Sequence, residues 1–203
     1  MRAYLAIASG FAASSLFGST STYLPAEFGG FEGRSLCAGD VSETIRSDAP
    51  MKDLQTPSEL RPGFTDAFAV RACHSAEFDL LEPSDQHRLF SESFTIGRQA
   101  TRMGITLMGQ TLRTKSDNMM KSAPVFPGTI QCPPSGDPVI LLSDAQTTGG
   151  YPRLASVARC DRHMLGQMRP GKRVQLLRRS PEEAVRDFEQ KRALIDQWFQ
   201  RDA

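Results

Sequence analysis

Short apolar runs separated by turn residues recur between residues 68 and 177 of this chain of 203 residues. Runs of this length, bounded by glycine, proline and small polar residues, predict buried β-strands. We predict strands at 68–73, 94–97, 105–108, 129–132, 139–142, 155–159 and 174–177. Their regular spacing, with turn signals between them, predicts an antiparallel β-barrel.

The C-terminal end has the pattern of a helix. Ser180-Pro181-Glu182-Glu183 is a capping box with proline at the first helical position. The following apolar residues share one face of that helix and are Val185, Phe188, Ile195 and Phe199, with Trp198 beside them. This stripe predicts packing on the chain's own domain, with contact to a partner as the alternative. A second, shorter helix is predicted over 83–90, with Ser84 as its cap.

The N-terminal part has weaker patterns. Residues 4–8 predict one more strand, and 18–40, rich in glycine, serine and threonine, predict loops and turns. Residues 46–66 contain three prolines and predict a connector.

Composition excludes several classes of protein. With 39% hydrophobic residues the chain can form a core. Its net charge of +1 is too small to indicate electrostatic attraction to nucleic acid or membranes. Basic residues concentrate between 151 and 179, where they predict either a solvated face or a positive rim for an anionic ligand. The four cysteines are far apart and form no metal or redox motif, which indicates reduced thiols in a cytosolic protein.

The most informative stretch is PVILLSDAQTTGGYPR at 138–153. An apolar strand leads directly into polar residues, which is where binding groups are commonly placed. By residue type alone, Asp144 is a general base, a metal ligand or an anchor for a substrate N–H, or it caps the following turn. Gly149 and Gly150 form an anion-binding nest or turn the chain.

This stretch resembles the signature of the biotin-dependent carboxyltransferase family. The family includes the C subunit of 5-oxoprolinase, the KipI antagonist, allophanate hydrolase subunit 2 and urea carboxylase. Further blocks resemble the family in its order: GSTSTYLPAEFGGFEGRSLCAGD (18–40), TRMGITLMG (101–109), PVFPGTIQCPPSGDPVILL (124–142) and LGQMRPGKRVQL (165–176).

The resemblance implies a mainly β fold. It implies a cyclophilin-like β-barrel with a C-terminal α-helix over 67–203, preceded by an incomplete N-terminal β-rich half and connector over 1–66. Residues 1–17 have the pattern of a secretory signal peptide, yet RAYLAIASG resembles an internal strand of the family, so we interpret them as part of the fold. Family members carry a further segment before this strand, and its absence predicts uncovered apolar faces.

The resemblance also implies site residues. The implied catalytic residues are Asp144, Gln146, Thr147 and Thr148. The implied residues for binding substrate or nucleotide are Arg34, Arg102, Gln131, Gly149, Gly150 and Tyr151. As a buried amide, Gln131 needs hydrogen bonds from neighbouring backbone or from a ligand, and Arg102 is the candidate anion clamp. No resident metal site is expected, and His74, His87 and His163 are interpreted as structural.

The function implied by the resemblance is that of one component of an ATP-dependent 5-oxoprolinase. It would open the lactam of 5-oxoproline to glutamate in the cytoplasm, with ATP and Mg²⁺. Its expected partners are a B-type subunit similar to KipI or allophanate hydrolase subunit 1, and a larger A-type subunit. The chain has no P-loop motif for ATP. The alternatives are a carboxyltransferase that acts on urea or a related amide with biotin on a separate carrier, and a regulatory protein that binds a KipI-like partner.

Overall fold

The computed structural model describes residues 2–45, 55–61, 63, 65–115 and 120–201. The chain divides into two compact units. We call Thr56–Ala203, together with Arg2, the barrel unit, and Ala3–Gln55 the N-terminal unit. The boundary between residues 66 and 67 stays a prediction.

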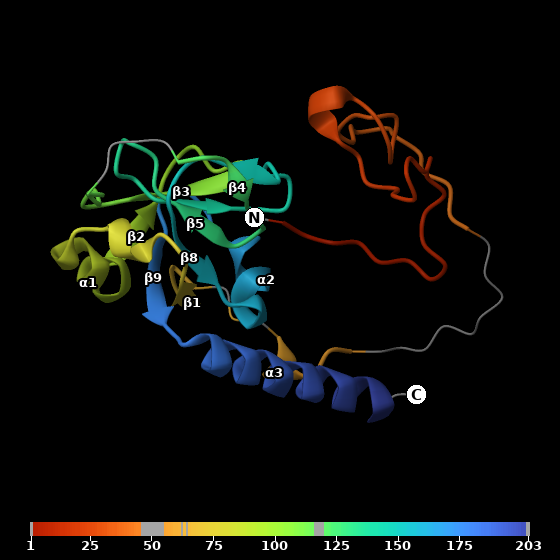
Figure 1. The fold of residues 1–203 in the computed structure, drawn as a ribbon. Helices are drawn as coiled ribbons and strands as arrows, with labels where there is room; N and C mark the ends of the chain where they lie inside the picture. Colours follow the sequence, from red (N-terminus) through yellow and green to blue (C-terminus); the bar gives the residue numbers. More distant parts are fainter. Residues whose placement is uncertain (1, 46–54, 62, 64, 116–119, 202–203) are drawn as a thin grey trace. The chain divides into compact units, whose positions relative to one another are not determined.

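Seven strands of the described barrel unit close into a barrel (Figure 1). They are β1 Ala67–His74, β2 Ser93–Ile96, β3 Gly104–Met108, β5 Thr129–Gln131, β6 Val139–Leu141, β8 Arg153–Val157 and β9 Arg173–Arg178. Their order around the barrel is β1-β8-β5-β6-β3-β2-β9. The predicted mainly β fold with a barrel and a C-terminal helix is therefore confirmed, although β8 begins and ends two residues earlier than its predicted strand.

The prediction that the barrel is wholly antiparallel is wrong for one pair of strands. β1 and β9 run parallel, from Ala67 opposite Arg173 to Ala72 opposite Arg178. The reason is geometric: strand directions cannot alternate all the way around a closed barrel of seven strands. One neighbouring pair must run in the same direction, and here it is the first and the last strand of the barrel.

Alternating burial along the strands builds the core. In β1 the side chains of Phe68, Val70 and Ala72 point inward and are buried, while Ala67 and Ala69 are exposed. The inward residues of the other strands complete one hydrophobic cluster, and those with at most 1% exposure include Ile96, Ile105, Leu107, Ile130, Ile140, Leu154, Val174 and Leu176. Burial of this apolar surface is the main stabilising contribution to the barrel.

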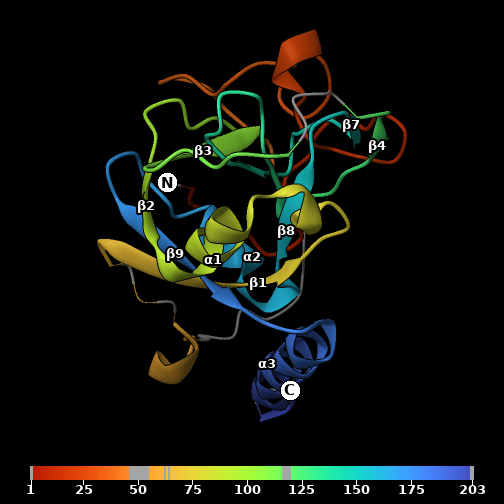
Figure 2. The same ribbon diagram turned by 60° about the vertical axis from the view of Figure 1, so that its left-hand side comes forward.

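Short helices lie between the strands. α1 Pro83–Ser91 packs against β9 (Figure 2), and η3 Phe78–Leu80 precedes it. The prediction that Ser84 caps α1 is wrong, because the helix begins at Pro83 and its N-cap is Glu82. Proline suits the first helical position, because the N–H of that residue has no partner within the helix. With Pro83 at this position, Ser84 lies inside the first turn. α2 Arg162–Leu165 follows η4 Arg159–Asp161.

The C-terminal helix α3, Pro181–Arg201, begins with the predicted capping box. The Ser180 N–H donates to Glu183 Oε2 at 2.8 Å, and the Glu183 N–H donates to Ser180 Oγ at 3.2 Å. Of the predicted stripe, Phe188 lies under the Arg159 guanidinium, 4.7 Å from its carbon to the ring centre. Val185 and Phe199 remain 55% and 60% exposed. The stripe therefore packs on the barrel unit only in part.

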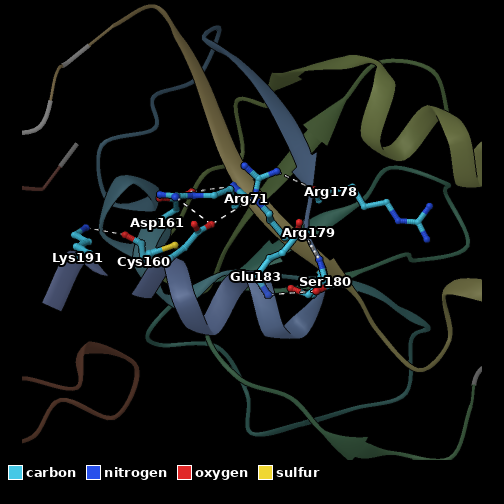
Figure 3. A network of polar contacts seen from close by, with 10 residues as sticks. Arg71, Cys160, Asp161, Arg178, Arg179, Ser180, Glu183 and Lys191 are labelled. Carbon is cyan, nitrogen blue, oxygen red and sulfur yellow. Dashed lines mark hydrogen bonds and ion pairs between the residues drawn. The ribbon is translucent and has the colours of Figure 1, made fainter. Parts of the chain in front are cut away.

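A network of polar contacts joins α3 to the barrel (Figure 3). Arg71 of β1 donates from Nε and Nη2 to the Asp161 carboxylate at 2.8 and 2.6 Å, and its Nη1 lies 3.1 Å from Asp187 of α3. Lys191 Nζ donates to the Cys160 carbonyl at 2.7 Å. Burial opposes the charge of Asp161, yet the Arg71 hydrogen bonds hold its pKa below the usual range.

The N-terminal unit is described by isolated bridges, turns and the short helix η1 Leu24–Ala26, which agrees with the loops predicted for 18–40. The predicted strand at 4–8 is wrong. A strand requires a paired neighbour, and no described residue pairs with these positions, where Tyr4 and Leu5 are 91% and 76% exposed. Residues 46–54, 62 and 64 of the predicted connector lie outside the described residues, and η2 Ser58–Leu60 lies within the connector.

Candidate functional site

Asp144 lies in the turn that follows β6. This stretch runs beside the residues before β3, because the Leu142 N–H donates to the Met103 carbonyl at 2.9 Å and the Asp144 N–H donates to the Arg102 carbonyl at 3.2 Å. The same alignment brings the two side chains together. Arg102 Nε lies 2.6 Å from Asp144 Oδ2, and Arg102 Nη2 donates to Oδ1 at 3.1 Å.

This bidentate ion pair joins a predicted catalytic residue to a predicted binding residue. The side chains of Arg102 and Asp144 are 54% and 19% exposed, so the pair lies at the surface. Arg102 is therefore already committed to a carboxylate, and an anionic ligand must compete with Asp144 for it. The pair can exchange partners with a substrate that offers both a carboxylate and an N–H group.

Gln131, Gln146, Gly149 and Tyr151 form a second group beside β5. The Gln131 side chain is 2% exposed, and its Nε2 donates to the Tyr151 carbonyl at 3.2 Å. Its Oε1 accepts from Gln146 Nε2 at 3.4 Å. The requirement that this buried amide be hydrogen-bonded is thus met within the chain, which gives Gln131 a positioning role under the signature.

The glycine pair serves this packing. A Cβ added at Gly149 would lie 2.7 Å from Gln131 Nε2, closer than real contacts allow, and Gly149 does not have a positive φ. Gly149 belongs to β7, Thr148–Gly149, which pairs with β4, Ala123–Pro124. The close backbone approach expected here is therefore to a side chain of the same chain. Gly149 therefore lies in a strand ladder where we predicted a turn or nest, and the Gly150 carbonyl that follows accepts from the Met120 N–H at 2.8 Å.

Thr147 and Thr148 are exposed at the tip of the signature, and Tyr151 is 37% exposed. The described residues provide no partner for either threonine hydroxyl, whereas the Thr147 carbonyl accepts from the Val125 N–H at 2.9 Å. The backbone is fixed and the hydroxyls face outward. This part of the signature can therefore donate hydrogen bonds to a ligand.

Arg34 belongs to the N-terminal unit. It donates to both oxygens of Asp40 at 2.8 Å and forms an ion pair with Glu32 at 2.8 Å. The Arg34 hydrogen bonds, together with the Cys37 N–H, lower the pKa of Asp40 to about 2. The contacts give Arg34 a role in the structure of its own unit, and its predicted binding role stays a prediction.

The structure adds an ion pair at the end of the signature that the sequence patterns did not reveal. Arg153, the last residue of the signature, has Nε 2.7 Å and Nη2 2.5 Å from the carboxylate of Glu77, whose pKa the Arg153 hydrogen bonds lower. Glu77 is 8% exposed. No local motif marks it, because its partner lies 76 positions away.

The basic stretch is largely engaged within the chain. Its members with partners include Arg153 with Glu77, Arg159 with Phe188, Lys172 with Asp66, Arg178 with Phe78 and Phe90, and Arg179 with Asp187. These contacts favour the interpretation as a charge-balancing face over that of a rim for an anionic ligand.

No metal cage is built from the residues that the structure describes. They contain no group of three or more His, Cys, Asp and Glu side chains placed to hold an ion. Arg102 is paired, and Gly149 lies in a strand rather than a nest. Among the same residues no helix has the length and apolar character needed to cross a membrane.

The sequence matches the model of the carboxyltransferase domain, subdomains A and B, over residues 1–178. The chain belongs to the carboxyltransferase domain family. It is 33% identical over 197 residues to the C subunit of 5-oxoprolinase from Escherichia coli and 35% identical over 198 residues to that of Haemophilus influenzae. Each match covers 97% of this chain but 62% of the relative, so the chain spans under two thirds of their length.

Solved structures share the fold of this carboxyltransferase domain. The urea amidolyase of Kluyveromyces lactis superposes with a TM-score of 0.82 at 22% identity, covering 94% of this chain and 13% of that one. At this identity the likeness establishes the shared fold alone. The names of the curated relatives establish similarity to subunits of enzymes.

Proposed function

We propose that this chain acts as part of the C subunit of an ATP-dependent 5-oxoprolinase, which converts 5-oxoproline to glutamate. Similarity to two proteins of that name over 97% of the chain supports the assignment. The observation that carries it is the exposed Asp144–Arg102 pair at the end of β6. A carboxylate and a guanidinium at one surface point match the N–H and the carboxylate of a cyclic amino-acid amide.

The chemistry requires activation of a poorly electrophilic amide carbonyl. In the proposed reaction ATP transfers its γ-phosphoryl group to the lactam oxygen and ADP leaves. Water then attacks the ring carbon, phosphate leaves, and the ring C–N bond breaks as the nitrogen takes up a proton, which gives glutamate. In our proposal Asp144 positions the substrate N–H or accepts a proton, and the hydroxyls of Thr147 and Thr148 donate to developing negative charge. Gln146, hydrogen-bonded to Gln131, holds the tip in place.

The proposal places the nucleotide in an assembled complex. Since the sequence has no P-loop motif, a KipI-like B-type subunit and a larger A-type subunit are proposed to supply ATP and Mg²⁺ binding. The proposed location is the cytoplasm, and neither nucleic acid nor membrane is a proposed partner.

The test combines the chain with the A-type and B-type subunits from the same genome. With ATP and 5-oxoproline we expect glutamate to form, and omission of this chain should abolish it. Asp144→Asn should lower turnover at least about 100-fold, within the range typical for the loss of an acid–base group. Asp196→Asn, an exposed carboxylate on α3, is the matched control and should leave turnover unchanged.

A complete mixture that forms no glutamate contradicts the assignment. If Asp144→Asn keeps full turnover, the catalytic role of Asp144 is wrong. If the chain binds its KipI-like partner without turnover of any substrate tested, the regulatory alternative is favoured.

One observation favours a second candidate function, a biotin-dependent carboxyltransferase. The chain is 29% identical over 182 residues, 84% of its length, to a putative urea carboxylase of Emericella nidulans. Biotin would be carried by a separate protein. Transfer of carboxyl from carboxybiotin to urea, in the absence of glutamate formation from 5-oxoproline, would replace the first proposal by this one.

A further inference from the structure

A groove of about 860 Å³ lies on the outer face of the barrel, and its lining shares no residue with the signature at 138–153 except Val139. Its size falls in the range of about 300–1,000 Å³ that is typical of small-molecule sites. The residues that we use below are Thr95, Arg98, Thr106, Met108, Asp137 and Val139.

Strand register explains the floor of this groove. Thr95 lies opposite Met108 across β2 and β3, and Thr106 lies opposite Val139 across β3 and β6. Because side chains alternate along a strand, these four point away from the core formed by their neighbours. Met108 is 44% exposed. The floor therefore presents an apolar surface with two hydroxyl groups among the apolar side chains.

Glycine keeps this floor open next to the loop that follows β2. A Cβ at Gly97 would lie 3.2 Å from Met108 Cγ and 3.2 Å from the Thr106 carbonyl oxygen. A side chain at this position would therefore crowd the floor. The next residue, Arg98, continues the lining.

The rim has two opposite charges that the described residues leave without an ion-pair partner. Arg98 is exposed in the loop after β2, and Asp137 is half-buried in the turn before β6. Asp137 lines the groove, and its backbone N–H donates to Ser135 Oγ at 3.4 Å. Among the described residues neither Arg98 nor Asp137 forms a salt bridge, whereas Arg102 and Arg153 each do.

We propose that this groove binds a small organic acid of the N-acyl amino acid class. A carboxylate fits the Arg98 guanidinium, an amide N–H fits the Asp137 carboxylate, and an apolar side chain fits the floor at Met108 and Val139. This ligand site is additional to the signature. It does not depend on the proposed 5-oxoprolinase activity, because its residues and its binding assay are separate.

N-acetyl-leucine is the probe, since it has all three groups. In a titration followed by two-dimensional amide NMR, we expect saturable shifts at Arg98, Thr106 and Val139. N-acetyl-leucine amide, which lacks the negative charge, should bind about tenfold more weakly, as expected for loss of one charge-assisted hydrogen bond.

Variants assign the binding to the groove. Arg98→Gln should weaken binding of N-acetyl-leucine about tenfold, and Asp137→Asn should weaken it by a smaller factor. Arg186→Gln is the matched control, because Arg186 is exposed on α3 and does not line the groove. Unchanged amide spectra away from the groove show that each variant is folded.

Three results overturn the proposal. They are an absence of saturable shifts, equal affinity for the acid and its amide, and equal loss of affinity in Arg98→Gln and Arg186→Gln. Failure of the glutamate assay leaves these measurements unaffected, so the two proposals are tested separately.

Discussion

The two units of this chain use apolar residues in opposite ways. In the barrel unit, side chains such as Ile140 and Leu154 are completely buried. Among the described residues of the N-terminal unit, Gly33 alone is buried. Large apolar side chains there remain exposed, among them Tyr4 at 91%, Phe17 at 99% and Val41 at 83%.

The difference shows that hydrophobic content alone does not produce a core. In the barrel strands every second side chain points inward, so these side chains form one common core. The N-terminal unit is interrupted by turns, with positive φ at Glu27, Gly29, Gly30 and Glu32 within a few positions. A stretch of this size has too little interior to stabilise itself. We therefore expect the stability of the described chain to reside in the barrel unit.

The largest expected difference between the units comes from truncating an apolar side chain. Ile140→Ala should lower the free energy of unfolding by about 3 kcal/mol, because it leaves a cavity between β3 and β5. Tyr4→Ala should change it by less than about 0.5 kcal/mol, as is usual for exposed positions. Urea unfolding followed by circular dichroism measures both. Equal losses would contradict the contrast between the units.

A smaller difference is expected from the two aspartate–arginine pairs. Asp161→Ala removes a 5%-exposed carboxylate from Arg71 and should cost about 2 kcal/mol. Asp40→Ala removes the partner of Arg34 in the exposed N-terminal unit and should leave the global unfolding transition unchanged. Urea unfolding at pH 7 compares the two variants. A large effect of Asp40→Ala would show that the N-terminal unit unfolds together with the barrel.

The smallest effect is expected from pH at the docking site of α3. Lys191 Nζ lies 2.8 Å from His163 Nδ1, and burial, followed by the Lys191 charge, lowers the pKa of His163 below its ordinary value of 6.5. Asp161 opposes this shift and Arg71 adds to it. The unfolded chain therefore binds a proton at a higher pH than the folded chain, and stability should fall as pH drops through 6.5.

His163→Gln provides the control for this pH effect. Between pH 8 and pH 5.5 the unfolding free energy of the variant should fall less than that of the wild type. The difference between the two is the contribution of His163. If wild type and variant have parallel pH profiles, the contact between Lys191 and His163 does not couple protonation to folding.

Local patterns predicted the elements well because their causes are local. The capping box at Ser180 and Glu183 acts within one helical turn, and the apolar run at 139–142 needs only its own alternation to be a strand. The need of Gln131 for partners also followed from its residue type. Ser84 was mispredicted as a cap because the proline before it begins the helix.

The sequence predicted which residues belong to the candidate site but not which of them contact one another. Asp144 and Arg102 were each singled out, yet their ion pair joins positions 42 apart and depends on the register of β3 and β6. Gly149 was expected to approach a ligand, and it approaches Gln131 instead. The Glu77–Arg153 pair could not be predicted, because no local motif marks Glu77 and the two residues lie 76 positions apart.

The sequence by itself determined the β-strands, the C-terminal helix, the family resemblance and the polar character of the signature, since each follows from neighbouring residues. Only the tertiary structure decided which charged side chains form ion pairs, which two parallel strands close the barrel and where the groove on its outer face lies. Those features depend on barrel closure and strand register, which bring together residues that lie far apart in the chain.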